Sequence, residues 1–136
     1  MDVIVFLGEQ WILVSAFMAL LYLFVWTEQK KGGQRLSPHQ AVMLQNQDMA
    51  IVLDVRDAAD FKAGHITDAI NIPFAKLKER LGELDKHKEK TIIVVDKMGQ
   101  HSGTCGKDLL SAGFTAARLQ GGMSEWDAQK LPVIKG

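Results

Sequence analysis

The sequence has little that would support a disulfide framework, a metal centre or a nucleic-acid interface. Its one cysteine, Cys105, excludes an internal disulfide bond. No group of cysteines and histidines has the spacing of zinc ligands, and there is no internal repeat or low-complexity tract. The 16 Lys and Arg residues balance the 16 Asp and Glu residues, which argues against a nucleic-acid partner. We therefore expect no metal, no cofactor and no nucleic acid.

Long apolar runs are also absent, except at the amino end. Residues 3–26 are almost wholly apolar, with Glu9 and Gln10 as the strongly polar exceptions, and a helix of this length would reach about 36 Å. A cleaved signal peptide and a buried core helix are the alternatives. However, the amino end carries Asp2 and no Lys or Arg, and no small-residue cleavage site follows. We therefore predict an uncleaved transmembrane anchor at residues 1–27.

The charges after this segment predict its orientation. Lys30, Lys31 and Arg35 follow the apolar run, and the positive-inside rule places that flank in the cytoplasm. We expect a single-pass protein with its amino terminus outside, its folded domain in the cytoplasm and the lipid bilayer as a partner. Glu9 either lies at one membrane interface or is a functional carboxylate that contacts another helix. Two glycines favour a flexible linker at residues 28–34.

Strand and helix signals alternate through residues 35–136. Ser37 followed by Pro38 is typical of a helix start, and Leu77, Leu81 and Leu84 share one helical face. The expected elements are helices at 38–47, 74–84, 103–112 and 123–129, a single turn after Asp57, and strands at 50–55, 69–72, 91–95 and 117–119. This order predicts a three-layer α/β fold, in which a parallel sheet of about five strands has helices on both faces.

Residues 91–112 contain the most informative pattern. The strand 91–95 is apolar without alternation, as in a sheet buried on both faces. Gly99 and a helix N-cap at Ser102 would let successive N–H groups of the 96–102 loop converge on one anion. Such loops, between a strand and a helix, are where open α/β folds bind ligands. The expected anion-binding residues are Lys97, Met98, Gly99, Gln100, His101 and Ser102.

Several short motifs lie within about residues 35–135. They are Asp54-Val55-Arg56, Phe61 to Ile66, Ala69 to Pro73, the 96–102 loop, Gly113-Phe114 and Leu119 to Trp126. In this order and spacing they resemble one known family, the rhodanese homology domain. The combination with an amino-terminal membrane helix is similar to the bacterial membrane-anchored rhodanese-like proteins. This similarity implies a location in the bacterial inner membrane.

The resemblance also exposes a departure at the start of the loop. In active members this residue is a cysteine, and the loop N–H groups hold its thiolate and persulfide, but here it is Asp96. Converging N–H groups lower a thiol pKa and so activate it, whereas a carboxylate cannot exchange sulfur. It can accept the same hydrogen bonds. The six residues 96–101 match the loop length of the sulfur-handling members rather than the longer phosphatase loop, and His101 stands where many members have arginine.

Other candidate residues each have a functional and a structural interpretation. Cys105 is either a nucleophile in the first helical turn or a core residue, since it shares a face with Leu109 and Ala112. His65 has an implied orienting role, or is a partly exposed turn residue. Asp54 and Arg56 either line the pocket or pair with each other or with loop backbone. Lys97 and His101 either attract an anion or neutralise Asp96.

We therefore predict a membrane-anchored rhodanese-like domain without persulfide chemistry, which acts as a binding or regulatory module for another membrane or cytoplasmic protein. The resemblance leaves enzyme activity open, but Asp96 weighs against it. One alternative is a thiosulfate or persulfide sulfurtransferase, or a sulfur carrier, that uses Cys105. Another alternative is a scaffold that recognises a membrane protein through its amino-terminal helix.

Overall fold

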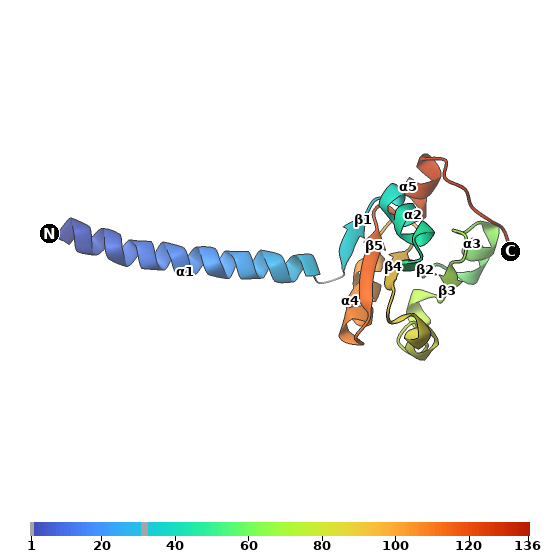
Figure 1. Cartoon of the computed structure of the whole chain (residues 1–136), viewed down its shortest axis with the longest axis horizontal. Coiled ribbons are helices and arrows are strands. Elements are labelled where there is room, and N and C mark those ends of the chain that lie inside the picture. The colour runs from blue at the N-terminus through green and yellow to red at the C-terminus, as the bar shows by residue number, and fades with distance from the viewer. Residues whose placement is uncertain (1, 31–32) are drawn as a thin grey trace. The chain divides into compact units, whose positions relative to one another are not determined.

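The computed structural model describes residues 2–30 and 33–136. These residues form two units that divide between residues 30 and 31 (Figure 1). The first is the helix α1 (Asp2–Lys30), and the second contains every other helix and strand of the described chain.

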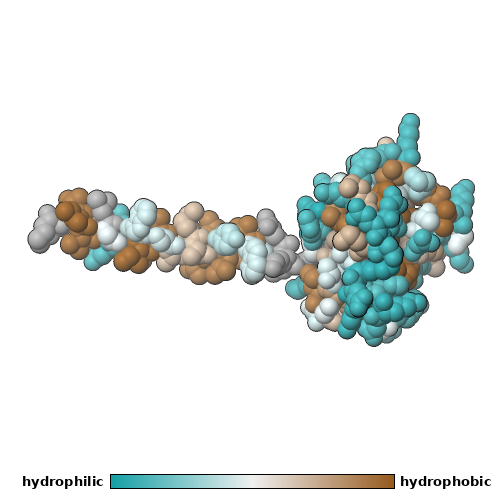
Figure 2. All heavy atoms as spheres, viewed as in Figure 1, coloured by the Kyte–Doolittle hydropathy of each residue, from teal (hydrophilic) through white to brown (hydrophobic). Residues whose placement is uncertain are grey.

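Helix α1 is long and apolar enough to cross a membrane. Its span from Val3 to Trp26 has a mean hydropathy of 1.9, and the side chains whose burial is described along this span are exposed. Figure 2 shows apolar side chains along the visible face of this helix. The helix extends past the predicted boundary at residue 27, so residues 28–30 of the predicted linker are helical. Residues 31 and 32 of that linker lie outside the described residues.

Residues 33–136 fold around one sheet of five parallel strands. The strand order is β1-β5-β4-β2-β3. The strands are β1 (Gln34–Leu36), β2 (Ala50–Asp54), β3 (Ile70–Asn71), β4 (Thr91–Val95) and β5 (Thr115–Leu119). The predicted parallel α/β architecture is confirmed. Strand β1 was not predicted, because it has only three residues and begins with Gln34 inside the expected linker.

Helices cover both faces of this sheet, as predicted. They are α2 (Pro38–Asn46), α3 (Ala58–Ala63), α4 (Ser102–Ser111) and α5 (Gly122–Ala128). Successive strand residues point to opposite faces, so Ile93 packs in one core cluster with Trp126 of α5, and Val94 packs in the other with Leu109 of α4. Accordingly, α2 and α5 lie on one face and α4 on the other (Figure 1).

The predicted helix at 74–84 is wrong. Two short 3-10 segments, η1 (Phe74–Lys76) and η2 (Leu81–His87), replace it. Leu77 and Leu84 are nevertheless fully buried, so the apolar spacing was a sound guide to burial. Gly82 lies inside the predicted helix, and glycine costs about 1 kcal/mol in a helix interior. Short segments therefore bury the same leucines without a continuous helix.

Candidate functional site

The 96–102 loop connects the carboxyl end of β4 to the start of α4, and it encloses its own first side chain. Asp96 is buried, with 2% of its surface exposed. Its carboxylate accepts hydrogen bonds from the N–H groups of Gly99, His101 and Ser102, the last two at 2.6 and 3.0 Å. Gly99 has a φ of +96°, which favours glycine. The anion closest to these N–H groups is therefore the protein's own aspartate.

Asp96 also changes how α4 begins. Ser102 was predicted as the N-cap, but the cap residue is His101 and Ser102 is the first residue of the helix. The hydroxyl of Ser102 donates to the carbonyl oxygen of Gly99 at 3.2 Å. The Asp96 carboxylate binds the Ser102 N–H, and so takes the part that a capping side chain would play.

The outer side chains of the loop point away from this carboxylate. Lys97, Met98 and Gln100 are exposed, and the ring of His101 stacks on that of Phe74 with centroids 4.0 Å apart. In the described part of the chain, no ion pair joins Lys97 or His101 to Asp96. The backbone N–H groups, rather than these two side chains, therefore stabilise the Asp96 charge.

The start of α5 holds the loop from its other side. The N–H of Met123 donates to the Asp96 carbonyl at 2.8 Å, and the N–H of Ser124 donates to the Lys97 carbonyl at 2.9 Å. Gly122 packs directly against the loop, since a Cβ built there would lie 2.8 Å from the Asp96 carboxylate oxygen Oδ1. Sequence reasoning assigned no role to Gly122. The adjacent glycines at 121 and 122 were the available signal.

Cys105 lies in the core beneath the loop. It is 2% exposed and packs in the same cluster as Leu109 and Val94. Burial, together with the negative charges of Asp108 and Asp96, raises the pKa of its thiol to about 11. A thiol with this pKa is neutral at physiological pH, and therefore a poor nucleophile.

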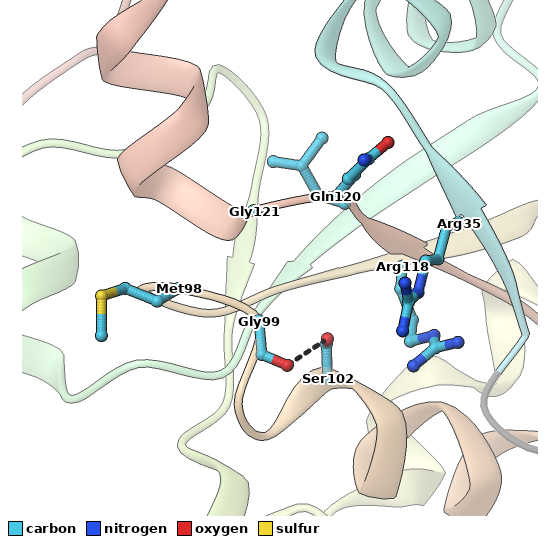
Figure 3. A pocket seen from close by; sticks show the side chains of 8 residues that line it. Arg35, Met98, Gly99, Ser102, Arg118, Gln120 and Gly121 are labelled. Carbon is cyan, nitrogen blue, oxygen red and sulfur yellow. Dashed lines mark hydrogen bonds between the residues drawn. The ribbon is translucent and has the colours of Figure 1, made fainter.

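A cavity of about 200 Å³ lies beside the loop, on the side of β1 and β5. Figure 3 shows Arg35 and Arg118 approaching it from these strands, with Ser102 at the start of α4 and Met98 in the loop. We call it the arginine cavity; Gly99 and Gln120 also line it. Sequence reasoning did not bring these two arginines together. Among the described residues, no group of three or more His, Cys, Asp or Glu could hold a metal ion.

Comparison with known proteins agrees with this geometry. The family model for the rhodanese-like domain matches residues 37–129. The chain belongs to this family. The fold and the family that the sequence motifs indicated are thereby confirmed.

Relatives of this rhodanese-like protein differ in how much of the chain they share. The uncharacterised protein YibN of Escherichia coli K12 is 34% identical over 140 residues, which cover 99% of this chain and 98% of YibN. The thiosulfate sulfurtransferase PspE of the same organism is 31% identical over 84 residues, covering 62% of this chain and 78% of PspE. A rhodanese-related protein from Thermoplasma volcanium has a TM-score of 0.68 at 25% identity, and the match covers 76% of this chain and 99% of that one.

Asp54 and Arg56 of the rhodanese-like domain pair with each other. The Arg56 guanidinium donates from Nη2 to Asp54 Oδ2 at 2.7 Å, and from the same nitrogen to the Gly64 carbonyl at 2.7 Å. The amide of Asn71 donates to the carbonyl oxygens of both Asp54 and Arg56 at 3.0 Å. These contacts hold the end of β2 to the turn that contains Gly64. Neither Asp54 nor Arg56 lines the arginine cavity.

His65 joins two backbone segments, one at Phe61 and one at Ile134. It is 5% exposed, so the expectation of a partly exposed turn residue is wrong. Its Nδ1 lies 2.7 Å from the Phe61 carbonyl, and its ring stacks on the Phe61 ring. Its backbone exchanges two hydrogen bonds with Ile134. His65 therefore fixes residues near the carboxyl end to α3.

Proposed function

We propose that this chain is a membrane-anchored rhodanese-like protein that does not transfer sulfur, and that it acts as a binding or regulatory module. The observation that carries the proposal is the buried Asp96 carboxylate, which accepts hydrogen bonds from three N–H groups of the loop. In the sulfur-handling members that the sequence resembles, these groups hold a cysteine persulfide. A carboxylate provides no sulfur nucleophile there, and its negative charge repels thiosulfate.

The partner in this proposal is another protein that contacts the outside of the loop. Lys97, Met98 and Gln100 extend into solvent there, and Met98 has 62% of its surface exposed. An exposed methionine is an adaptable contact residue at binding surfaces. The loop is held by α5 and by its own aspartate, so it presents these side chains on a rigid base.

A sulfurtransferase that uses Cys105 is the second candidate. Similarity to PspE, which is named a thiosulfate sulfurtransferase, favours it. The burial of Cys105 and its pKa of about 11 weigh against it, because few molecules would carry a thiolate at neutral pH. The two candidates differ in whether Cys105 is needed for any sulfurtransfer.

Measuring thiosulfate:cyanide sulfurtransfer by the purified full-length chain in detergent tests the proposal. We expect the wild type to form no more thiocyanate than Cys105→Ala. We expect Asp96→Cys to gain activity, because the same N–H groups would then stabilise a thiolate and its persulfide. Mass spectrometry for a persulfide on the wild-type chain provides a second measurement.

The variants also separate the two candidates. Wild-type turnover that Cys105→Ala abolishes would contradict the module and support the enzyme. The double variant Asp96→Cys with Cys105→Ala is the matched control, since it shows whether any gained activity belongs to residue 96. Thermal melting of each variant, measured by circular dichroism, verifies that the domain remains folded.

We also propose that α1 spans the bacterial inner membrane, with the rhodanese-like domain in the cytoplasm. Supporting observations are the apolar span from Val3 to Trp26 and its lack of burial within the protein. Lys30 and Lys31 follow this span in the sequence, which favours a cytoplasmic flank. Glu9 lies towards the amino end of the span, where a carboxylate can reach the membrane interface.

A further inference from the structure

Strands β1 and β5 bring two arginines together at one edge of the sheet. The strands are parallel, and Arg35 is the register partner of Arg118. Residues opposite each other in paired strands project from the same face of the sheet. Leu36 and Leu119 belong to the core on the side of α2 and α5, so the two arginines project from the face that α4 covers. Figure 3 shows both side chains at the arginine cavity.

These two guanidinium groups lack the acidic partners that the other arginines have. The chain contains four arginines; Arg56 pairs with Asp54 and Arg80 pairs with Glu83. Within residues 2–30 and 33–136, the side chains of Arg35 and Arg118 make no hydrogen bond or ion pair, and the Nε of Arg118 is buried without a partner. Burial and the positive charge of Arg35 both lower the pKa of Arg118. Like charges in this position are costly unless an anion joins them.

The first turn of α4 adds to the positive potential of the cavity. Gly103 leaves room for Arg118, since a Cβ built at Gly103 would lie 3.1 Å from Nη1 of that guanidinium. The amino end of a helix carries a partial positive charge, which normally repels a guanidinium and attracts an anion. Arg118 therefore lies where an anion, rather than another cation, would be stable.

Polar groups for an oxyanion are available around the cavity. Gln120 lines it together with Arg35 and Arg118. Ser102 also lines the cavity, but its N–H and hydroxyl donors are already used within the loop. Guanidinium groups bind oxyanions through paired N–H donors, which match phosphate geometry. A volume of about 200 Å³ exceeds the roughly 30 Å³ share of one water several-fold, and so holds a tetrahedral oxyanion with its remaining water.

We propose that Arg35 and Arg118 bind a phosphate-type oxyanion in the arginine cavity. The cavity borders the 96–102 loop through Gly99 and Ser102, but its guanidinium donors are not the N–H groups that bind the Asp96 carboxylate. The proposal does not depend on the loss of sulfurtransfer. The phosphate group belongs either to a soluble anion or to an anionic phospholipid headgroup. A headgroup is within reach of the chain if α1 spans a bilayer, because Arg35 follows Lys30 by only five residues, which extend at most about 18 Å.

Arginine side-chain NMR on the full-length chain in phosphatidylcholine nanodiscs tests this proposal. The four arginine Nε–H signals are assigned by substitution, and inorganic phosphate is then titrated at constant ionic strength. We expect saturable shifts of the Arg35 and Arg118 signals, while the Arg80 signal stays unchanged. Removing one charge-assisted partner should weaken phosphate binding at least about tenfold in Arg35→Gln and in Arg118→Gln.

Arg80→Gln is the matched control, since it removes an arginine whose partner is Glu83 and should retain phosphate binding. Nanodiscs that contain phosphatidylglycerol form the second arm. Shifts in these discs without added phosphate assign the headgroup as the source, and shifts only with phosphate assign a soluble anion. Neither shift, or equal effects in Arg35→Gln and Arg80→Gln, would overturn the proposal. Arg35 is an exposed residue, so Arg35→Gln keeps the test valid if Arg118→Gln fails to fold.

Discussion

Asp96 keeps N–H groups of the 96–102 loop paired with a carboxylate, which is not itself a sulfur nucleophile. A buried N–H without a hydrogen-bond partner lowers the stability of the folded state by about 1–3 kcal/mol. A loop whose N–H groups converge on one point is therefore stable only when an anion occupies that point. The carboxylate meets that need permanently with bonds to Gly99, His101 and Ser102. The loop is more stable with this carboxylate than it would be without an anion, but these N–H groups cannot then bind a ligand.

The chemistry of Cys105 follows from its burial. Its pKa of about 11, against an ordinary value of 9.0, leaves roughly 100-fold less thiolate at neutral pH. We expect iodoacetamide to alkylate the folded chain at least about 100-fold more slowly than the urea-unfolded chain at neutral pH. Mass spectrometry measures both rates directly, because the chain has a single cysteine.

The pH dependence of this alkylation tests whether the pKa of the Cys105 thiol is raised in the folded chain. A raised pKa means that the folded chain resists deprotonation, so its reaction rate should continue to rise above pH 9.0 and level off only near about 11. The unfolded chain should level off earlier. Rapid alkylation of the folded chain at neutral pH would contradict the core assignment, and Cys105→Ala controls for labelling at other residues.

Among the secondary-structure elements, α5 supports the loop through its first residues, and the closest approach is at Gly122. Gly122 has a φ of +59° and lies against Asp96. A side chain at this position would meet both an unfavourable backbone conformation and the loop itself. The contact explains why a glycine far along the chain bears on the candidate site.

We expect Gly122→Ala to destabilise the domain by about 2–5 kcal/mol, as the sum of about 1–2 for the left-handed conformation and about 1–3 for the collision with Asp96. Gly113→Ala is the matched control, because Gly113 has a φ of +91° with no atom within 4 Å of an added Cβ. It should lose only about 1–2 kcal/mol. Urea unfolding followed through the indole N–H signal of Trp126, a buried residue, measures both. Equal losses would show that the loop tolerates a side chain at 122.

The whole molecule combines two units with opposite solvent requirements. Helix α1 exposes large apolar side chains along its span, such as Trp11 at 74% and Phe17 at 65%. Monomeric soluble proteins rarely expose apolar patches larger than a few hundred Å². The rhodanese-like domain, by contrast, buries its own core on both faces of the sheet. A lipid environment for α1 and an aqueous one for the domain satisfy both requirements.

The proposed orientation predicts how the chain responds to external protease. With the domain in the cytoplasm, a protease-cleavable tag placed after Gly136 should remain intact in sealed spheroplasts and be cut after detergent permeabilisation. The positive-inside rule supplies the physical reason, through Lys30 and Lys31. Cleavage in sealed spheroplasts would reverse the orientation, and a periplasmic marker protein controls for protease activity outside the membrane.

Local patterns were sufficient for most of the fold and for part of the candidate site. The apolar pattern of residues 91–95 and the spacing of the leucines correctly predicted which side chains are buried. Such a pattern depends on which face of a segment packs against the core. The convergence of N–H groups on Asp96 was also foreseeable, since all its partners lie within six residues. The 3-10 segments at 74–76 and 81–87 were not foreseeable. The leucine spacing indicates which side chains are buried, but it does not show whether the helix between them is continuous.

Contacts between distant segments had no such signal. Arg35 and Arg118 become neighbours only when β1 pairs with β5. Strand β1 is too short to show a sequence pattern that would predict this pairing. Gly122 reaches Asp96 only when α5 packs against the loop. Hydrophobic period and turn residues are properties of neighbouring positions, and they therefore predict elements and local hydrogen bonds. Which charges share a cavity depends on strand order and register, and these are established when the whole sheet assembles.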